Sequence, residues 1–165
     1  MTNDSGQWQG WFDAHGAALV LLARQIVPSR TDAEDVVQDA FIRFWRTRGT
    51  VVDPVAYLFA CVKHCALDWQ RSRRRQARRE EQAARPEMEA MFVTSGEHNE
   101  RQTAIEDALR DLPTEQAEVL VLKIWGELTF PQIAEALDIP PNTAASRYRY
   151  AIAKLRESLA EEPIR

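Results

Sequence analysis

The sequence predicts an all-α protein of two small helical domains joined by a flexible linker. Apolar residues recur three and four positions apart in both halves of the 165-residue chain, which is the spacing of one buried helix face. Residues 81–100 instead combine Pro86, Gly96 and several acidic residues with little periodicity. We therefore expect one domain at residues 8–80, a second at residues 101–160, and an acidic linker between them.

Three helices account for most of the first domain, and no strand pattern competes with them. The first is expected at residues 8–27, before a Pro-Ser pair. Asp32 is placed to cap the second helix, whose apolar and polar residues fall on opposite faces. Asp53 and Pro54 are a strong start signal for a long third helix that continues to about residue 79.

Positive charge is gathered in two stretches, although the formal net charge is −4. Residues 71–79 read RSRRRQARR, residues 147–156 also lack acidic side chains, and the intervening residues 80–118 are strongly acidic. A local basic stripe attracts a phosphate backbone whatever the net charge, so two such surfaces predict two contacts with one nucleic acid. The alternative for residues 71–79 alone is an ordinary solvated helix face.

Residues 129–159 have the pattern of a helix-turn-helix. The apolar positions expected to bury the first helix are Phe130, Ile133, Ala134 and Leu137. Thr129 caps this helix, with Gln132 as the reciprocal partner of a capping box. Pro140 and Pro141 set the backbone angle where the second helix starts. Its expected apolar stripe consists of Ala145, Tyr148, Ile152, Leu155 and Leu159.

The opposite face of this second helix carries side chains suited to base edges and phosphates. These are Asn142, Thr143, Ser146, Arg147 and Tyr150. The segment is therefore interpreted as a DNA-reading element. A helical hairpin with a solvated basic face is the alternative, because this geometry also arises from ordinary helix packing.

Composition argues against several classes of protein. No apolar run approaches the roughly 20 residues of a membrane span, and residues 1–9 lack the basic and apolar parts of a secretory signal. We therefore expect a cytoplasmic protein without membrane insertion. No glycine-rich phosphate loop, nucleophile elbow or metal-ligand set is present, and the three histidines are scattered. We expect no catalytic residue, no enzyme activity and no cofactor.

The two cysteines, Cys61 and Cys65, lie one helical turn apart on an apolar stripe of the long helix. Free cysteine packs as a small hydrophobe, so we expect both thiols in the core. A metal site with His64 is disfavoured, because the set lacks a recognised zinc spacing and His64 points away from the cysteine face.

Three ordered segments resemble bacterial RNA polymerase sigma factors of the extracytoplasmic-function (ECF) group. They are residues 32–46 (DAEDVVQDAFIRFWR), residues 53–75 (DPVAYLFACVKHCALDWQRSRRR) and residues 112–159, which contain the helix-turn-helix. The resemblance implies a four-helix promoter-melting domain of the sigma region-two type. It also implies a flexible linker and a four-helix domain of the region-four type that reads the upstream promoter element. The implied function is that of an alternative sigma factor, a subunit that gives core RNA polymerase its promoter choice.

The resemblance assigns roles to residues of the first domain. Asp35, Gln38 and Asp39 match the surface that contacts the clamp helices of the beta-prime subunit, where they would form charge-assisted hydrogen bonds. The loop at residues 48–53 matches the one that receives a base flipped from the melted strand, and Tyr57 would supply part of that pocket.

Other implied contacts involve DNA and further proteins. Lys63, Arg71, Arg74 and Arg75 would follow the backbone of the downstream element, adding affinity that falls with salt. Promoter DNA, the polymerase beta flap and an anti-sigma factor are the implied partners besides the clamp. The linker contains Met88, Met91 and Phe92, which are candidates either for docking on a partner or for packing against a domain of the chain.

The chain departs from the family pattern at four positions. Ala145 stands where a basic residue is usual, Asp138 where glycine is usual, and Pro140 where a serine-type cap is common. His64 replaces an asparagine in the long helix. We therefore expect an unusual upstream promoter sequence and fewer phosphate contacts around it.

Two other functions compete with the sigma-factor interpretation. A stand-alone helix-turn-helix regulator would need a ligand pocket or a symmetric interface rather than an arginine stripe beside an aromatic helix. A protein that mimics a sigma factor to sequester its regulator would be expected to have lost its DNA-facing basic residues, whereas residues 71–79 retain them. The arginine stripe favours a sigma factor over both.

Overall fold

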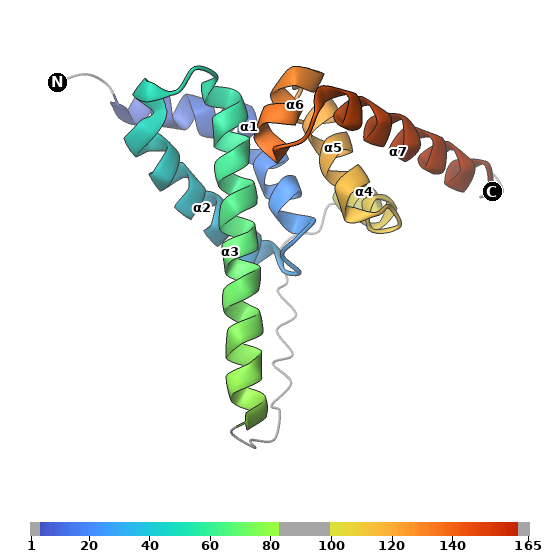
Figure 1. Ribbon diagram of the computed structural model, residues 1–165, viewed down its shortest axis with the longest axis horizontal. Coiled ribbons are helices and arrows are strands. Elements are labelled where there is room, and N and C mark those ends of the chain that lie inside the picture. Colours follow the sequence, from blue (N-terminus) through green and yellow to red (C-terminus); the bar gives the residue numbers. More distant parts are fainter. Residues whose placement is uncertain (1–3, 83–99, 162–165) are drawn as a thin grey trace.

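The computed structural model describes residues 4–82 and 100–161 (Figure 1). Within these ranges the chain forms seven α-helices, one 3-10 helix and no strand, which confirms the all-α prediction. The N-terminal half consists of α1 (Asp4–Arg24), α2 (Arg30–Thr47), the 3-10 helix η1 (Arg48–Thr50) and α3 (Pro54–Gln82). The C-terminal half consists of α4 (Glu100–Arg110), α5 (Thr114–Ile124), α6 (Phe130–Leu137) and α7 (Pro141–Glu161). The linker residues Met88, Met91 and Phe92 lie outside the described residues.

The start of α2 differs from the prediction, because Ser29 and not Asp32 is the N-cap. Ser29 has an extended backbone, and its hydroxyl accepts a hydrogen bond from the Asp32 N–H at 3.1 Å. The Asp32 carboxylate accepts in turn from the Ser29 hydroxyl at 2.7 Å. Asp32 thus occupies the third helical position, where its negative charge favours the helix start.

The predicted start of α3 is confirmed, and the helix runs a few residues beyond its expected end. The Asp53 carboxylate accepts a hydrogen bond from the Ala56 N–H at 3.1 Å, and Pro54 occupies the first helical position, where a missing N–H has no cost. The second half of α3 projects from the body of the molecule (Figure 1).

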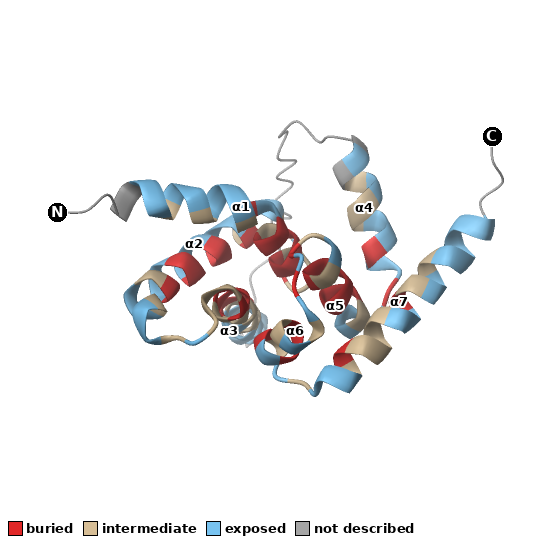
Figure 2. Cartoon of the chain, turned by 90° about the horizontal axis from the view of Figure 1, so that it is seen from above, coloured by how far each residue is buried: buried red, intermediate tan, exposed pale blue. Residues whose placement is uncertain are grey.

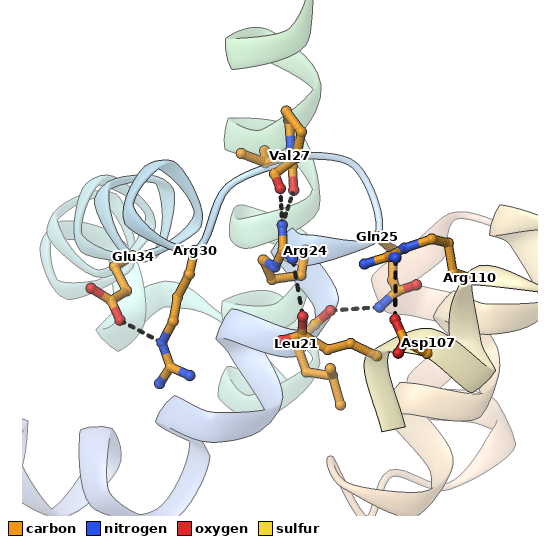
Figure 3. Close-up of polar contacts among 10 residues, drawn as sticks. Leu21, Arg24, Gln25, Val27, Arg30, Glu34, Asp107 and Arg110 are labelled. Carbon is orange, nitrogen blue, oxygen red and sulfur yellow. Dashed lines mark hydrogen bonds and ion pairs between the residues drawn. The ribbon is translucent and has the colours of Figure 1, made fainter. Parts of the chain in front are cut away.

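The connection from α1 to α2 is held by the side chain of Arg24. Its guanidinium donates to the carbonyl oxygens of Val27 and Pro28, as Figure 3 shows for Val27. The helix therefore ends at Arg24, three residues before the predicted end, while Val27 remains fully buried.

One hydrophobic core joins both halves. Buried residues of α1, α2 and α3 form a single cluster with those of α4, α5, α6 and the first half of α7. Figure 2 shows the buried residues of the described helices in red. Among the described helices, α3 packs against both α2 and α6, and α1 packs against α5. The C-terminal half therefore rests directly on the N-terminal half.

The predicted helix-turn-helix is confirmed, including the capping box of its first helix. Thr129 and Gln132 form the capping box of α6: the Thr129 N–H donates to the Gln132 side chain at 2.9 Å, and the Gln132 N–H donates to the Thr129 hydroxyl at 3.3 Å. Asp138 ends α6 in the left-handed conformation, with φ of 54°. The carbonyl of Pro140 accepts from the N–H groups of Thr143 and Ala144, which closes the first turn of α7.

The buried stripe of α7 lies partly on other residues than predicted. Ala144 and Ala151 are the fully buried positions, whereas Ala145, Tyr148, Ile152 and Leu155 are half-buried. Leu159 is 71% exposed, contrary to the prediction. The reason is that the last turns of α7 extend past the helices that it packs against, as both views show (Figures 1 and 2).

Replacing Asp138 by glycine is expected to stabilise the protein. Glycine adopts the left-handed conformation without the clash between the β-carbon and the backbone. Part of the gain is offset by the larger backbone entropy of glycine in the unfolded chain. We therefore expect the free energy of unfolding to rise by about 0.5–1 kcal/mol. Urea denaturation of wild type and Asp138→Gly measures this difference. A lower midpoint for the variant would mean that the aspartate side chain stabilises the turn.

Candidate nucleic-acid interface

The outer face of α2 exposes the three predicted polymerase-contacting residues together. Asp35, Gln38 and Asp39 are all exposed, while Val36 and Val37 between them are buried. A groove of about 480 Å³ between α1 and α2 begins beside this face. Its lining residues are Phe12, Asp13, Gly16, Ala17, Val20, Arg30, Glu34, Val37 and Gln38. The face thus combines acidic and amide side chains with a neighbouring apolar floor.

The loop before α3 lies beside a group of aromatic side chains. The Arg48 guanidinium stacks over the Trp45 ring at 3.6 Å from its centroid. Tyr57 is half-buried, and its hydroxyl forms a hydrogen bond of 3.1 Å with the Thr47 hydroxyl. Val52 at the loop tip is fully exposed. Tyr57 was predicted from the sequence, whereas Trp45 and Arg48 were not, although their i, i+3 spacing could have indicated them.

The arginines of distal α3 are exposed, as the sequence predicts. Arg71, Arg74 and Arg75 lie on one face of the projecting part of the helix. Arg71 forms a surface ion pair of 3.4 Å with Asp68, and exposed pairs of this kind are weak enough to exchange for a phosphate. The Arg73 guanidinium lies over the Trp69 ring at 5.2 Å.

Lys63 lies in a different environment from these arginines. Its ammonium group contacts both carboxylate oxygens of Glu118 in α5, at 2.5 and 2.6 Å. The two side chains are only 21% and 3% exposed. The structure therefore places Lys63 between the two halves rather than on the arginine surface. Glu118 was missed in the sequence, although a charge directly before the apolar run Val119–Leu122 was a signal.

The outer face of α7 differs by one arginine from the prediction. Asn142 and Tyr150 are exposed, and Thr143 and Ser146 are half-exposed. Arg147 is turned toward α5, where it forms an ion pair of 3.3 Å with Glu115 and is 26% exposed.

Arg149 occupies the outward position instead. It is exposed, and its guanidinium donates to the Ser146 hydroxyl at 3.3 Å. The spacing of Asn142, Ser146 and Arg149 is the spacing of one helix face, so the sequence already contained the signal for Arg149.

The cysteines are buried in the core, as predicted. Cys61 and Cys65 are free thiols, and burial raises the pKa of each, which keeps both protonated and unreactive. His64 is exposed. Within the described ranges, no group of three or more metal-ligating side chains comes together, and no helix is long and apolar enough to cross a membrane.

Comparison with known families accounts for both halves of the chain. Residues 11–76 match the Sigma-70 region 2 family, and residues 102–155 match the Sigma-70 region 4 family. The RNA polymerase sigma-E factor of Streptomyces avermitilis is 30% identical over 145 residues, covering 86% of this chain and 79% of the relative. The ECF RNA polymerase sigma factor SigL of Mycobacterium tuberculosis is 30% identical over 156 residues, covering 91% and 87%.

Solved structures agree with these matches. CnrH in complex with the cytosolic domain of CnrY superposes with a TM-score of 0.64 at 27% identity, covering 98% of this chain and 92% of that one. The sigma factor RpoE in complex with the anti-sigma factor NepR from Bartonella quintana has the same fold, with a TM-score of 0.70 at 19% identity over 95% and 99% of the two chains. The chain belongs to the ECF RNA polymerase sigma factors. It is an alternative sigma factor that directs transcription initiation.

Proposed function

We propose that this factor contacts core RNA polymerase through α2 and the promoter at two places, the upstream element through α7 and the downstream element through α3 and its preceding loop. The observation that carries the proposal is the pairing of a capped helix-turn-helix, with Asn142, Ser146 and Arg149 turned outward, and an exposed arginine stripe on α3. Each surface has the chemistry of a nucleic-acid contact.

The acidic face of α2 is the proposed contact for the clamp helices of the beta-prime subunit. Asp35 and Asp39 would pair with basic side chains, and Gln38 would add a hydrogen bond at the edge of the apolar groove. The C-terminal half would contact the beta flap. Cytoplasmic location follows from this proposal, because core polymerase acts there.

The aromatic group before α3 is the proposed site for a base taken out of the stack. The Trp45 ring and the Arg48 guanidinium offer flat surfaces for stacking, and the Tyr57 and Thr47 hydroxyls offer polar edges. The arginines of distal α3 would hold the phosphates beside it. Their contribution would be affinity rather than sequence choice.

An anti-sigma factor is the proposed inhibitor. The support is the likeness to CnrH, whose structure contains the cytosolic domain of CnrY, and the common fold with RpoE bound to the anti-sigma factor NepR. Such a partner would cover the polymerase-contacting face or the DNA-contacting faces.

Run-off transcription tests the function directly. Purified factor added to core polymerase on genomic templates is expected to produce starts at a limited set of promoters. Core polymerase alone provides the background. Specific DNA binding without any gain in polymerase starts would instead support a stand-alone regulator.

Removing both acidic side chains of the clamp-contacting face should weaken polymerase binding. We expect Asp35→Ala with Asp39→Ala to raise the Kd for core polymerase at least about tenfold, because charge-assisted hydrogen bonds across the interface are lost. Fluorescence anisotropy of labelled factor measures the Kd. Asp111→Ala with Glu135→Ala removes the same charge from exposed positions of the C-terminal half and is the matched control. Equal Kd values for the two double variants would refute the assignment of α2.

The two arginines of α7 are expected to differ in their effect on promoter reading. Arg149→Ala should weaken binding to the upstream element by about 5- to 150-fold if Arg149 contacts a base edge. Arg147→Ala should have a smaller effect, since Arg147 is paired with Glu115. Binding of the holoenzyme to promoter fragments measures both, with Arg110→Ala, an exposed arginine of α4, as control. The reverse order of effects would make Arg147 the reading residue.

A further inference from the structure

The ion pair between Lys63 and Glu118 links the two halves at a buried point. The carboxylate is almost completely buried, and both of its oxygens lie within 2.6 Å of the lysine ammonium. A carboxylate at such a site is costly unless it is paired. The ion pair therefore exists only while α3 and α5 are packed together.

Other contacts also join the two halves. Phe59 lies one turn before Lys63 on α3, so close to Gly126 that a β-carbon there would be 3.2 Å from the ring. Asp53 accepts a hydrogen bond from the Gln132 amide at 3.2 Å, and Arg24 pairs with Glu106 of α4 at 3.0 Å, with both side chains largely buried. These contacts define a closed arrangement.

We propose that the Lys63–Glu118 ion pair is a latch that keeps the free factor closed and withholds Lys63 from DNA until the halves separate. The proposal rests on the proposed function, together with the DNA-backbone contact that the family resemblance implies for Lys63. A single ammonium group cannot sit between the two carboxylate oxygens in a buried interface and on a DNA phosphate at the same time. Closing and promoter binding are therefore mutually exclusive for Lys63.

The chemistry of the latch suits repeated opening. Separation returns both charges to water, so the hydration lost on closing is recovered, whereas a purely apolar contact would have no such compensation. A phosphate offers the ammonium the same kind of anionic oxygen that Glu118 offers. Opening therefore exchanges one anion for another at Lys63.

The latch lowers the affinity of the free factor for polymerase if the closed form does not bind. The observed Kd then exceeds the intrinsic Kd by the inverse of the open fraction. A factor that is open about one tenth of the time would bind about tenfold more weakly than one that is always open.

The first test uses the full-length factor without any partner. Glu118→Gln removes the buried charge and leaves the predicted DNA-contacting residue Lys63 in place. We expect small-angle X-ray scattering to give a larger radius of gyration for Glu118→Gln than for wild type. Glu135→Gln, the same change at an exposed position of α6, should remain closed. Far-UV circular dichroism verifies that the helices persist.

The second test exchanges the charges. Glu118→Lys places two ammonium groups together and should open the molecule further. Lys63→Glu combined with Glu118→Lys restores an opposite pair and should return the radius of gyration to the wild-type value. Equal radii for wild type, Glu118→Gln and Glu118→Lys would overturn the latch.

Polymerase binding separates this inference from the proposed function. We expect Glu118→Gln to bind core polymerase about tenfold more tightly than wild type. If Glu118→Gln were open but bound core polymerase with unchanged affinity, closing would not control polymerase binding. That result would overturn the regulatory role of the latch. If neither protein bound polymerase, the proposed function would fail, and the scattering data would still decide whether Glu118 closes the chain.

Discussion

Burial of α5 on every side is the constraint on which the packing of this sigma factor depends. Residues 117–122 are all buried, whereas a surface helix buries only one stripe. The helices α6 and α7 cover part of α5, and α1 covers another part from the opposite half. Each fully buried valine or leucine contributes about 1.5–3 kcal/mol relative to its exposed state, so this apolar run draws the two halves together. Glu118 is tolerated within it because Lys63 neutralises its charge.

The proposed functional surfaces are the helix faces that this core does not use. In α2 the two buried valines lie between exposed acidic residues. In α7 the buried residues are Ala144 and Ala151, while Asn142, Ser146 and Arg149 lie on the outer face. Distal α3 extends beyond the core, so its arginines are exposed to solvent. The packing that fixes the positions of the helices therefore also leaves their polar faces exposed to solvent.

The local features of the chain were predictable because short-range interactions determine them. The capping box at Thr129, the start of α3 at Asp53 and the arginine stripe depend on neighbours within a few positions along the chain. The burial of the cysteines was predictable from the apolar spacing around them. Which of Ser29 and Asp32 caps α2 was harder to predict, because both residue types favour the cap position and the two residues form hydrogen bonds with each other.

The features that escaped prediction depend on contacts between distant segments. Spacing alone could not show that Arg147 would meet Glu115 or that Lys63 would meet Glu118, since neither pair is close in sequence. Leu159 continued the apolar pattern of α7, but it is 71% exposed because the last turns of α7 extend past the described helices that it packs against. Periodicity identifies a face that is suited to burial, while the length of the neighbouring helix decides how much of it is covered.

The hydrogen bonds of the Gln132 side chain limit which residue types the chain can accept at this position. Its oxygen receives the Thr129 N–H and completes the cap of α6, while its nitrogen donates to Asp53, whose other oxygen caps α3. Glutamate is the other residue type that completes a capping box, yet here it would set a carboxylate against that of Asp53. The amide therefore connects the caps of two helices, and each cap is complete without the other. In the proposed opening, the loop before α3 and the helix-turn-helix would separate as preformed units, and neither would have to refold.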